Sequence, residues 1–370
     1  MDNSRFFVLQ PRAGRYLTEQ ADDLQRQMQD VLQEVGGSLD NLLQMRVYVS
    51  DAANQCALLR SHRLVADHAP LGVVSFVEQP PLGGAKLALL LWFVGGKVLE
   101  REVISQPGSS GVVLKQSGLT YILHSVRFGQ SSAEETAGVQ LNKAFESHIS
   151  LLRTQGLNLK DHCHRTWIYV RDVDCQYAQV VKARNEIFAR EGLTRDTHYI
   201  ASTGIGGATE YAGAYVATDF FSVDGPGLSA VGYLHATDYL NPTHEYGVAF
   251  ERGTFLDLPS ERLFLVSGTA SIDRHGECVH QGDVLTQAGR LFLNIEKLLE
   301  SAGGSLGCVS YFVVYLRDVS DYAAIRDYIR LRFPDKPFLL TLGRVCRPGW
   351  LIETECIALT AQGDRRFRNY

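Results

Sequence analysis

Two carboxylates stand two residues apart near the end of the sequence, in the segment Ile352-Glu-Thr-Glu-Cys-Ile-Ala-Leu359. Alternate residues of a strand share a face, so Glu353 and Glu355 should point the same way. The mostly apolar segment predicts that the pair is buried, and burial raises the pKa of a carboxyl group. A carboxyl group that stays protonated near neutral pH could serve as a general acid. The alternative for a single strand glutamate is an exposed carboxylate on an edge strand.

A thiol lies seven residues before this pair, at Cys346 in Arg344-Val-Cys-Arg-Pro348. Taken alone, a cysteine is most often a small buried apolar residue. The chain has seven cysteines, an odd number, and they are scattered without a C-x-x-C pair. This usage is typical of reduced thiols rather than of a disulfide framework or a zinc site.

Two further motifs could bind ions. The segment Ala201-Ser-Thr-Gly-Ile-Gly-Gly207 could offer backbone amides to an anion as a nest, although it lacks the lysine and the helix of a nucleotide-binding loop. His162 and His164 would share one face of a strand, but no third and fourth ligand follows at a useful spacing. We therefore expect neither a metal nor another cofactor.

Composition and charge argue against several classes of protein. The 370 residues are 45% hydrophobic and carry a net charge of −5, with a short basic run only in the tail at Arg365, Arg366 and Arg368. This balance argues against nucleic acid as the main partner. Residues 1–12 lack the pattern of a signal peptide, and the apolar run 87–94 is too short to span a bilayer. We expect a cytoplasmic globular protein without membrane contact.

One pattern occurs three times along the chain. Val35-Gly-Gly-Ser-Leu39 precedes Arg46-Val-Tyr-Val-Ser-Asp51, and related pairs of segments recur at 155–172 and 302–318. The interval from the leucine to the aspartate is 12 or 13 residues in each copy. The sequence therefore predicts three copies of one α/β unit, over residues 1–104, 105–225 and 226–370.

The elements around the repeated pattern can also be predicted. Apolar residues at helical spacing before each copy predict helices, and the glycine after each helix suits a left-handed cap. Second helices are expected at 177–189 and 322–332, and closing strands at 86–93, 211–221 and 350–360. Front hairpins are expected at 112–115 with 120–124 and at 247–251 with 263–268, whereas the first copy has only a stub at 6–9. The first copy should therefore lack its front hairpin.

The third copy resembles the Rid (YjgF-type) family from Tyr246 through Gly268-Thr-Ala, Asn294-Ile295, Tyr315-Leu-Arg-Asp318 and Ile352-Glu-Thr-Glu355. Members of that family are small α/β proteins that form trimers with sites between subunits. The resemblance implies a fold like that of bacillus chorismate mutase, with three units forming a single-chain pseudo-trimer that could be a monomer or a weak oligomer. Imine deaminases of the family hold substrate with an arginine after a proline, and that arginine is missing from 69–72, 197–200 and 336–339.

A narrower resemblance covers roughly residues 110 to 360. Four motifs look like those of the chorismatases: Arg165-Thr-Trp-Ile-Tyr-Val170, His198-Tyr-Ile-Ala-Ser-Thr-Gly-Ile205, Glu245-Tyr-Gly-Val-Ala-Phe-Glu-Arg-Gly253 and Ser267-Gly-Thr-Ala-Ser-Ile272. These enzymes cleave the enolpyruvyl ether of chorismate without a cofactor. The resemblance implies release of pyruvate and 3-hydroxybenzoate, with 4-hydroxybenzoate as a possible second product, supplying an aromatic precursor for secondary metabolism. Alternatives are hydrolysis to the dihydroxycyclohexadiene carboxylate, a Rid-type imine deaminase and a small-molecule binding protein.

The resemblance also implies roles for individual residues. Glu353 corresponds to the acid of the family and Cys346 to a cysteine that assists formation of 3-hydroxybenzoate, whereas Glu355 is expected to be a structural partner. Chorismate carries two carboxylates, and the planar fork of arginine binds carboxylates bidentately. The expected substrate-binding residues lie in or beside the matched motifs, and each could instead be an ordinary salt-bridge or buried residue: Arg165, Tyr199, Tyr246, Arg252 and Arg347. The site should lie between the second and third units.

Overall fold

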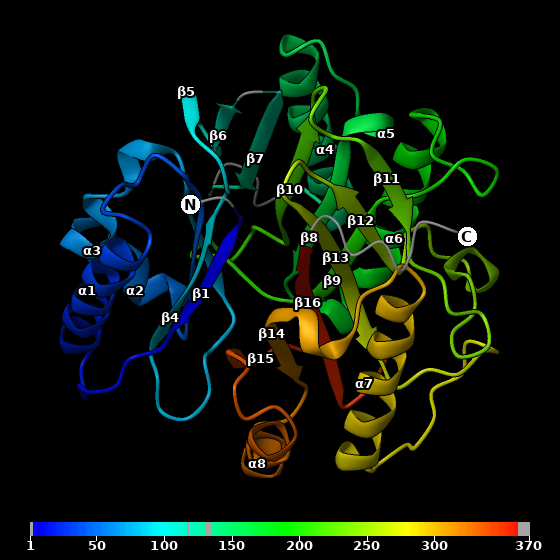
Figure 1. Cartoon of the computed structure of the whole chain (residues 1–370). Helices are drawn as coiled ribbons and strands as arrows, with labels where there is room; N and C mark the ends of the chain where they lie inside the picture. Colours follow the sequence, from blue (N-terminus) through cyan, green and yellow to red (C-terminus); the bar gives the residue numbers. More distant parts are fainter. Residues whose placement is uncertain (1–2, 117, 130–134, 362–370) are drawn as a thin grey trace.

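The protein is described by a computed structural model that covers residues 3–116, 118–129 and 135–361. Within these residues the chain forms three mixed α/β units, each built on one sheet (Figure 1). The first sheet has the strand order β1-β4-β2-β3, the second β5-β6-β7-β10-β8-β9 and the third β11-β12-β13-β16-β14-β15. The last four strands of each order correspond, which confirms the threefold repeat of one unit.

The first unit has the smallest sheet. Its strand β1 pairs antiparallel with β4, and β2 pairs parallel with β3. Nothing in its sheet corresponds to the two outer strands of the other sheets, so the expected loss of the front hairpin is confirmed. Its elements are β1 (Arg5–Leu9), α1 (Leu17–Glu34), β2 (Leu42–Val49), α2 (Ala52–Ser61), α3 (Arg63–Ala66), η1 (Ala69–Leu71), β3 (Val74–Glu78) and β4 (Leu87–Phe93).

The second unit begins earlier than the sequence suggested. Its outermost strand, β5, pairs with β6, so the boundary expected at residue 104 falls inside β5. Most residues of β5 are exposed, so the sequence gave no sign that this segment pairs with the strand that follows it. The elements are β5 (Val98–Gln106), β6 (Ser109–Gln116), β7 (Leu119–Arg127), α4 (Ala137–Thr154), α5 (Leu159–His162), β8 (Cys163–Val170), α6 (Val173–Arg190), β9 (Ala201–Gly206) and β10 (Val216–Asp224).

The third unit carries the strand with the paired carboxylates. β16 lies between β13 and β14, so the alternative that Glu353 stands on an edge strand is wrong. The front hairpin is formed by β12 and β13, and the strand expected at 247–251 instead starts at Gly253. The elements are β11 (Ala230–Tyr233), η3 (Thr243–Tyr246), β12 (Gly253–Asp257), β13 (Glu261–Ala270), α7 (Val284–Glu300), η4 (Leu306–Cys308), β14 (Val309–Leu316), η5 (Val319–Asp321), α8 (Tyr322–Arg332), β15 (Phe338–Leu342) and β16 (Ile352–Ala361).

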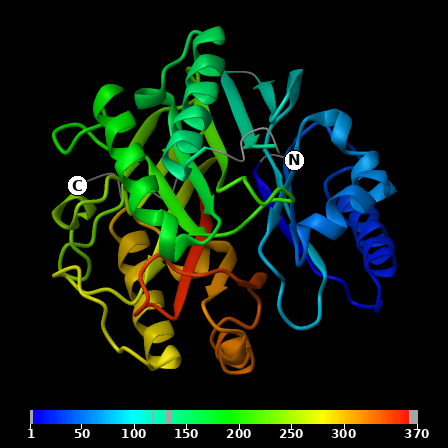
Figure 2. The same ribbon diagram turned by 180° about the vertical axis from the view of Figure 1, so that it is seen from behind.

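One long helix covers each sheet, and its apolar stripe forms the core. α1 buries Leu24, Met28 and Val31, and α4 and α7 bury residues at the same helical spacing. The glycines that follow the three helices, Gly36, Gly156 and Gly303, all have positive φ, which confirms the expected left-handed caps. Figure 2 shows the same three units from behind.

The units are joined where their parallel strands end. The backbone N–H of Glu78 donates to the carbonyl of Ala208 (2.8 Å), that of Gly206 to Arg344 (2.8 Å) and that of Leu342 to Pro80 (2.9 Å). Each unit thus bonds to both others through β3, β9, β15 and the residues after them. This closed arrangement is that of a pseudo-trimer within one chain. No helix in the described part of the chain is long and apolar enough to cross a membrane.

Candidate active site

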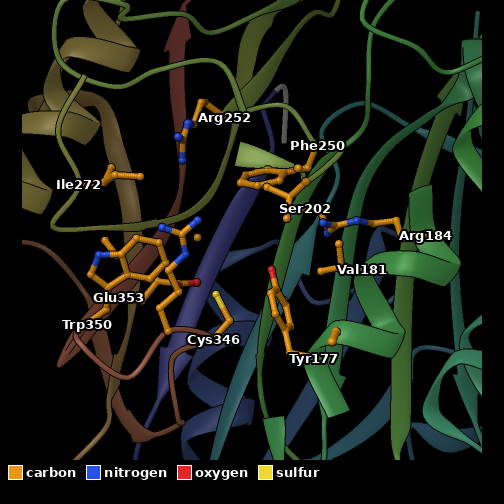
Figure 3. Close-up of a pocket in the computed structure, with 17 residues that line it drawn as sticks. Tyr177, Val181, Arg184, Ser202, Phe250, Arg252, Ile272, Cys346, Trp350 and Glu353 are labelled. Carbon is orange, nitrogen blue, oxygen red and sulfur yellow. The ribbon is translucent and has the colours of Figure 1, made fainter. Parts of the chain in front are cut away.

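A cavity of about 390 Å³ lies between the second and third units. Helix α6 and strand β9 form one wall, and β13, β16 and the loop from β15 to β16 form the other (Figure 3). A segment that precedes β12 contributes Val248, Phe250 and Arg252. Cavities of this size accommodate small organic ligands.

Glu353 reaches the cavity from β16. Its residue is only 5% exposed, and burial, followed in effect by the neighbouring charge of Glu355, raises the pKa of its carboxyl group to about 8. The positive charges of Arg165 and Arg252 lower the pKa of Glu353, but their effects are smaller than those of burial and of Glu355. Glu353 is therefore a neutral carboxylic acid near pH 7, in contact with a ligand cavity.

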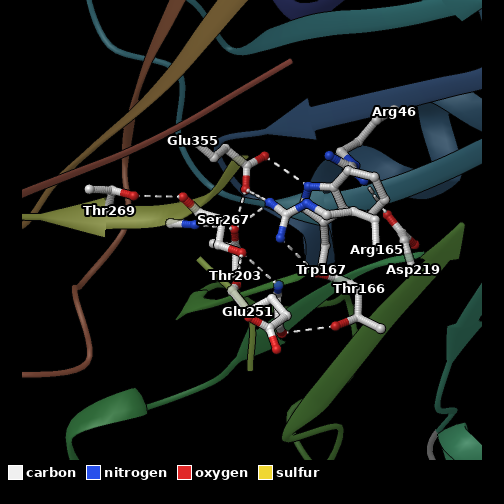
Figure 4. A network of polar contacts seen from close by, with 12 residues as sticks. Arg46, Arg165, Thr166, Trp167, Thr203, Asp219, Glu251, Ser267, Thr269 and Glu355 are labelled. Carbon is white, nitrogen blue, oxygen red and sulfur yellow. Dashed lines mark hydrogen bonds and ion pairs between the residues drawn. The ribbon is translucent and has the colours of Figure 1, made fainter. Parts of the chain in front are cut away.

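Glu355, on the same face, has a different environment (Figure 4). Its Oε2 accepts from Arg165 Nη2 (2.8 Å) and from Thr203 Oγ1, and its Oε1 accepts from Trp167 Nε1 (2.9 Å). These bonds hold Glu355 in an ion pair with Arg165, so side chains of the second unit bind its carboxylate. Glu353 instead reaches the cavity as a proton donor.

The backbone of β13 leaves room for the acid. A Cβ atom built at Gly268 would lie 2.0 Å from Oε1 of Glu353. The amide of Gly268 donates to Oγ1 of Thr203 (2.9 Å), which in turn bonds Glu355. The absence of a side chain at position 268 therefore fixes where the carboxyl group can lie.

Substitution Gly268→Ala should displace the Glu353 carboxyl group from its position. For a reaction in which Glu353 donates the proton, we expect kcat to fall at least about tenfold. The reason is that a proton donor in the wrong place loses a large part of general acid catalysis. The control is Gly289→Ala in α7, where an added Cβ meets nothing closer than 3.8 Å. Steady-state kinetics with far-UV circular dichroism would check this, and an unchanged kcat for Gly268→Ala would show that the position of the carboxyl group is not critical.

Cys346 and Tyr177 face each other across the cavity (Figure 3). Burial, followed in effect by the nearby Glu353, raises the pKa of the Cys346 thiol to about 12. Burial likewise holds the pKa of Tyr177 well above its usual value. The thiol is therefore protonated at neutral pH and can act as a hydrogen-bond donor or a proton carrier more readily than as a thiolate nucleophile.

Three guanidinium groups line the cavity: Arg184 from α6, Arg252 before β12 and Arg347 after β15. Arg184 and Arg252 both lie against the ring of Phe250, at 5.5 and 5.6 Å from its centre. Arg347 donates to the carbonyl of Gly276 and stacks 4.8 Å from the ring centre of Trp350. Glu353 is the only acidic residue among those that line the cavity. The cavity is therefore strongly positive.

Arg184 was not predicted from the sequence. Its residue is only 2% exposed, and its Nε and Nη2 atoms have no hydrogen-bond partner among the described residues. A signal was present, since Arg184 falls on the buried stripe of α6 with Val180 and Ile187. A buried guanidinium is costly unless an anion pairs with it, and within the cavity that anion would be a ligand.

The other predicted substrate-binding residues lie elsewhere. Arg165 does not line the cavity, because its guanidinium is buried against Glu355 and Thr203; it was expected to face the substrate. Tyr199 also lies outside the cavity lining and stacks on Phe188 with 6.3 Å between ring centres. The side chain of Tyr246 lies outside the described residues.

Two weaker expectations can be compared with the structure. The segment considered as an anion-binding nest forms strand β9, which pairs parallel with β8. The amide of Ser202 in this strand donates to Oγ of Ser267 (2.9 Å). His164 is buried against the carbonyl of Val223 (3.1 Å). Among the described residues, no group of three or more His, Cys, Asp or Glu side chains is placed to hold a metal ion.

Comparison with known proteins places the chain in a family. The profile of the endoribonuclease L-PSP family matches residues 255–360. The 3-aminoacrylate deaminase RutC of Acinetobacter baylyi is 32% identical over 102 residues, which are 27% of this chain and 80% of that protein.

One solved structure shares this fold over nearly the whole chain. The crystal structure of a chorismatase superposes with a TM-score of 0.70 at 18% identity, over 96% of this chain and 98% of the other. A putative endoribonuclease L-PSP from Entamoeba histolytica matches 35% of this chain and all of its own length, with a TM-score of 0.31 at 19% identity. The chain therefore belongs to the endoribonuclease L-PSP, or Rid, family, and it carries three units of that fold.

Proposed function

We propose that the protein is a chorismatase, which cleaves the enolpyruvyl ether of chorismate and releases pyruvate. The observation that carries the proposal is a neutral, buried carboxylic acid, Glu353, in a cavity lined by Arg184, Arg252 and Arg347. Chorismate has two carboxylates that need cations and an enol ether that needs a proton. The fold shared with a solved chorismatase over nearly the whole chain supports the same assignment.

Protonation starts the reaction. Glu353 gives its proton to the terminal methylene carbon of the enolpyruvyl group, which becomes an oxocarbenium ion, and the fixed charge of Glu355 stabilises nearby positive charge. The ring hydroxyl next to the ether can then displace the pyruvate oxygen from the ring and return its own proton to Glu353. The bond between the ring carbon and the ether oxygen breaks, and its electrons form the carbonyl of pyruvate.

When the ring hydroxyl displaces pyruvate, the reaction ends with the formation of 3-hydroxybenzoate. The ring carries a three-membered oxide after pyruvate leaves; opening of the oxide and loss of a ring proton give the aromatic product, and the oxygen takes up a proton. Cys346 and Tyr177 are both protonated and line the same cavity, and they would donate to that oxygen. Chorismate and the two products contain the same atoms, so this branch consumes no water. Hydrolysis to the diol would consume one.

The direct test is incubation of purified protein with chorismate while pyruvate is followed with a coupled lactate dehydrogenase. Pyruvate should appear far faster than without protein, with 3-hydroxybenzoate as the aromatic product on chromatography. In D2O the trapped pyruvate should carry one deuterium in its methyl group, because the proton comes from an exchangeable acid. Pyruvate formation at the spontaneous rate would refute the proposal.

Substitution Cys346→Ala should change the product more than the rate. Without the thiol, the oxide loses a proton donor and water gains space, so we expect the share of dihydroxycyclohexadiene carboxylate to rise several-fold relative to 3-hydroxybenzoate. Cys175→Ala, at an exposed position of α6, is the matched control. Chromatography of both aromatic and diol products checks the ratio; an unchanged ratio would remove Cys346 from product selection.

The raised pKa of Glu353 predicts the pH dependence. The acid must be protonated, and its pKa lies at about 8, so kcat/KM should be level between pH 6 and 7.5 and fall tenfold per pH unit above about 8.5. Both substrate carboxylates are ionised over that range. A profile measured from pH 6 to 10 checks this expectation, and a decline that begins near pH 5 would show that the acid titrates as an ordinary carboxyl group.

A further inference from the structure

A second cavity, of about 430 Å³, lies between the first and second units. Equivalent elements build it: α2 and β3 take the places of α6 and β9, and β7 takes the place of β13. The loop that follows β9 contributes Thr209, Glu210 and Tyr211. The cavity is thus the pseudosymmetric counterpart of the candidate active site.

This cavity has no acid at the catalytic position. In the third unit Glu353 pairs with Ala270 across β16 and β13. In the second unit the corresponding pair is Ala217 and Arg127 across β10 and β7. A cation therefore lies on the facing strand and an alanine at the position of the acid, so proton transfer of the kind proposed for Glu353 is absent from this site.

The two arginines that line the second cavity are already paired with carboxylates. Glu78 lines it as well, and its Oε2 accepts from the amide of Ala52 (2.7 Å). Arg60 forms a bidentate pair with Glu210, with 2.7 Å between Nη1 and Oε2. Arg127 lies 2.7 Å from Asp219 and also donates to the carbonyls of Phe76 and Thr218. By contrast, Arg184 in the first cavity has no partner for two of its nitrogens among the described residues. An anionic ligand would have to break an existing ion pair in the second cavity, which disfavours carboxylates there.

The groups in the second cavity that are available to a ligand are hydroxyl groups and aromatic rings. The Oγ atoms of Ser75 and Ser109 are buried and have no hydrogen-bond partner among the described residues. Ser75 is only 3% exposed. Phe76 and Phe128 line the same space, and the guanidinium of Arg60 lies 5.3 Å from the centre of the Phe76 ring. Unpaired buried hydroxyls favour a ligand that hydrogen-bonds to them.

We propose that the cavity between the first and second units is a separate, non-catalytic binding site for an uncharged aromatic compound with hydroxyl or amide groups. The matched ion pairs exclude anions, Ser75 and Ser109 provide hydrogen bonds, and Phe76 and Phe128 contact the ring. The site is independent of the proposed function. Its ligand is uncharged and binds between the first and second units, whereas the dianion chorismate is expected beside Glu353.

The test uses three probes that share a ring and a hydroxyl group and differ in charge: 3-hydroxybenzamide, 3-hydroxybenzoate and 3-hydroxybenzylamine. Titration calorimetry on the full chain should show that the amide binds at this site at least tenfold more tightly than the other two. Ala69→Trp, which adds a ring at the rim of this cavity, should weaken amide binding at least tenfold. Ala178→Trp, the matched change at the rim of the first cavity, should leave amide binding intact and weaken that of 3-hydroxybenzoate.

Ser75→Ala and Ser109→Ala give a second measurement that does not depend on a large side chain. Each removes a hydroxyl that bonds nothing in the described structure, so each variant should fold and should bind the amide several-fold more weakly. Absence of saturable amide binding would overturn the proposal. So would amide binding that Ala178→Trp abolishes and that Ala69→Trp and both serine variants leave unchanged.

Discussion

Glu353→Gln should lower kcat for pyruvate release by about 10³-fold, within the range that general acid catalysis contributes. Glutamine keeps the size of the side chain and can still fill the space beside Gly268, but it cannot give up a proton to carbon. Because the Glu353 carboxyl group is neutral near pH 7, its exchange for an amide introduces no new charge in the cavity. Binding of a substrate analogue should therefore change little, and the loss should appear in kcat.

The matched control is Glu300→Gln at the end of α7, where the carboxylate is exposed and pairs with Lys297. Its kinetics should be those of the unmodified protein. Calorimetry with 3-hydroxybenzoate would show whether the Glu353→Gln cavity is intact. Retained turnover in a variant that still binds this product would mean that another group delivers the proton.

Much of the fold follows from local patterns in the sequence. Helices, glycine caps and closing strands repeat at constant spacing, and each depends on neighbouring residues, so the three units could be found without a structure. Strand β5 could not be assigned in this way, because its exposed face carries no periodic apolar signal and its partner β6 is set by a hairpin turn. The start of β12 was misplaced because the preceding segment lines the cavity and, at Glu251, bridges to Ala201 of the second unit.

The site was predictable where it depends on one strand. Glu353 and Glu355 share a face because they stand two apart, and the burial of both was expected from the apolar residues of β16. Their different environments were not predictable, since Glu355 is bonded by residues from another unit, Arg165 and Trp167. A motif can mark Arg165 as important, but only the packing of two units shows that it pairs with Glu355 and not with a ligand.

Arg184 shows the converse case, a residue in the cavity that no motif indicated. It stands on α6, where a second helix of the unit was expected at 177–189, and the cavity exists only because the third unit packs against that helix. Its buried guanidinium, without a partner for two nitrogens among the described residues, is the feature of the first cavity that most directly calls for an anion.

Arg184→Met should raise KM for chorismate by about 10²-fold, because a charge-assisted hydrogen bond to a carboxylate contributes about 1.5–3 kcal/mol. Methionine approximates the length of the side chain and keeps contact with Phe250, so the helix should remain packed. In the absence of substrate the variant should be more stable than the parent, since a buried cation without a matched anion is removed. Urea denaturation would measure that difference.

Lys182→Met on the same helix is the matched control, because its ammonium group is exposed and pairs with Glu186, one turn away. Its KM should stay within about twofold of the parent value, since surface pairs of this kind contribute little. If Arg184→Met changed kcat and left KM unaltered, the guanidinium would act on the transition state instead of on substrate binding. If it changed neither, the substrate carboxylates would have to be held by Arg252 and Arg347, and the buried charge of Arg184 would serve the packing of α6 against Phe250.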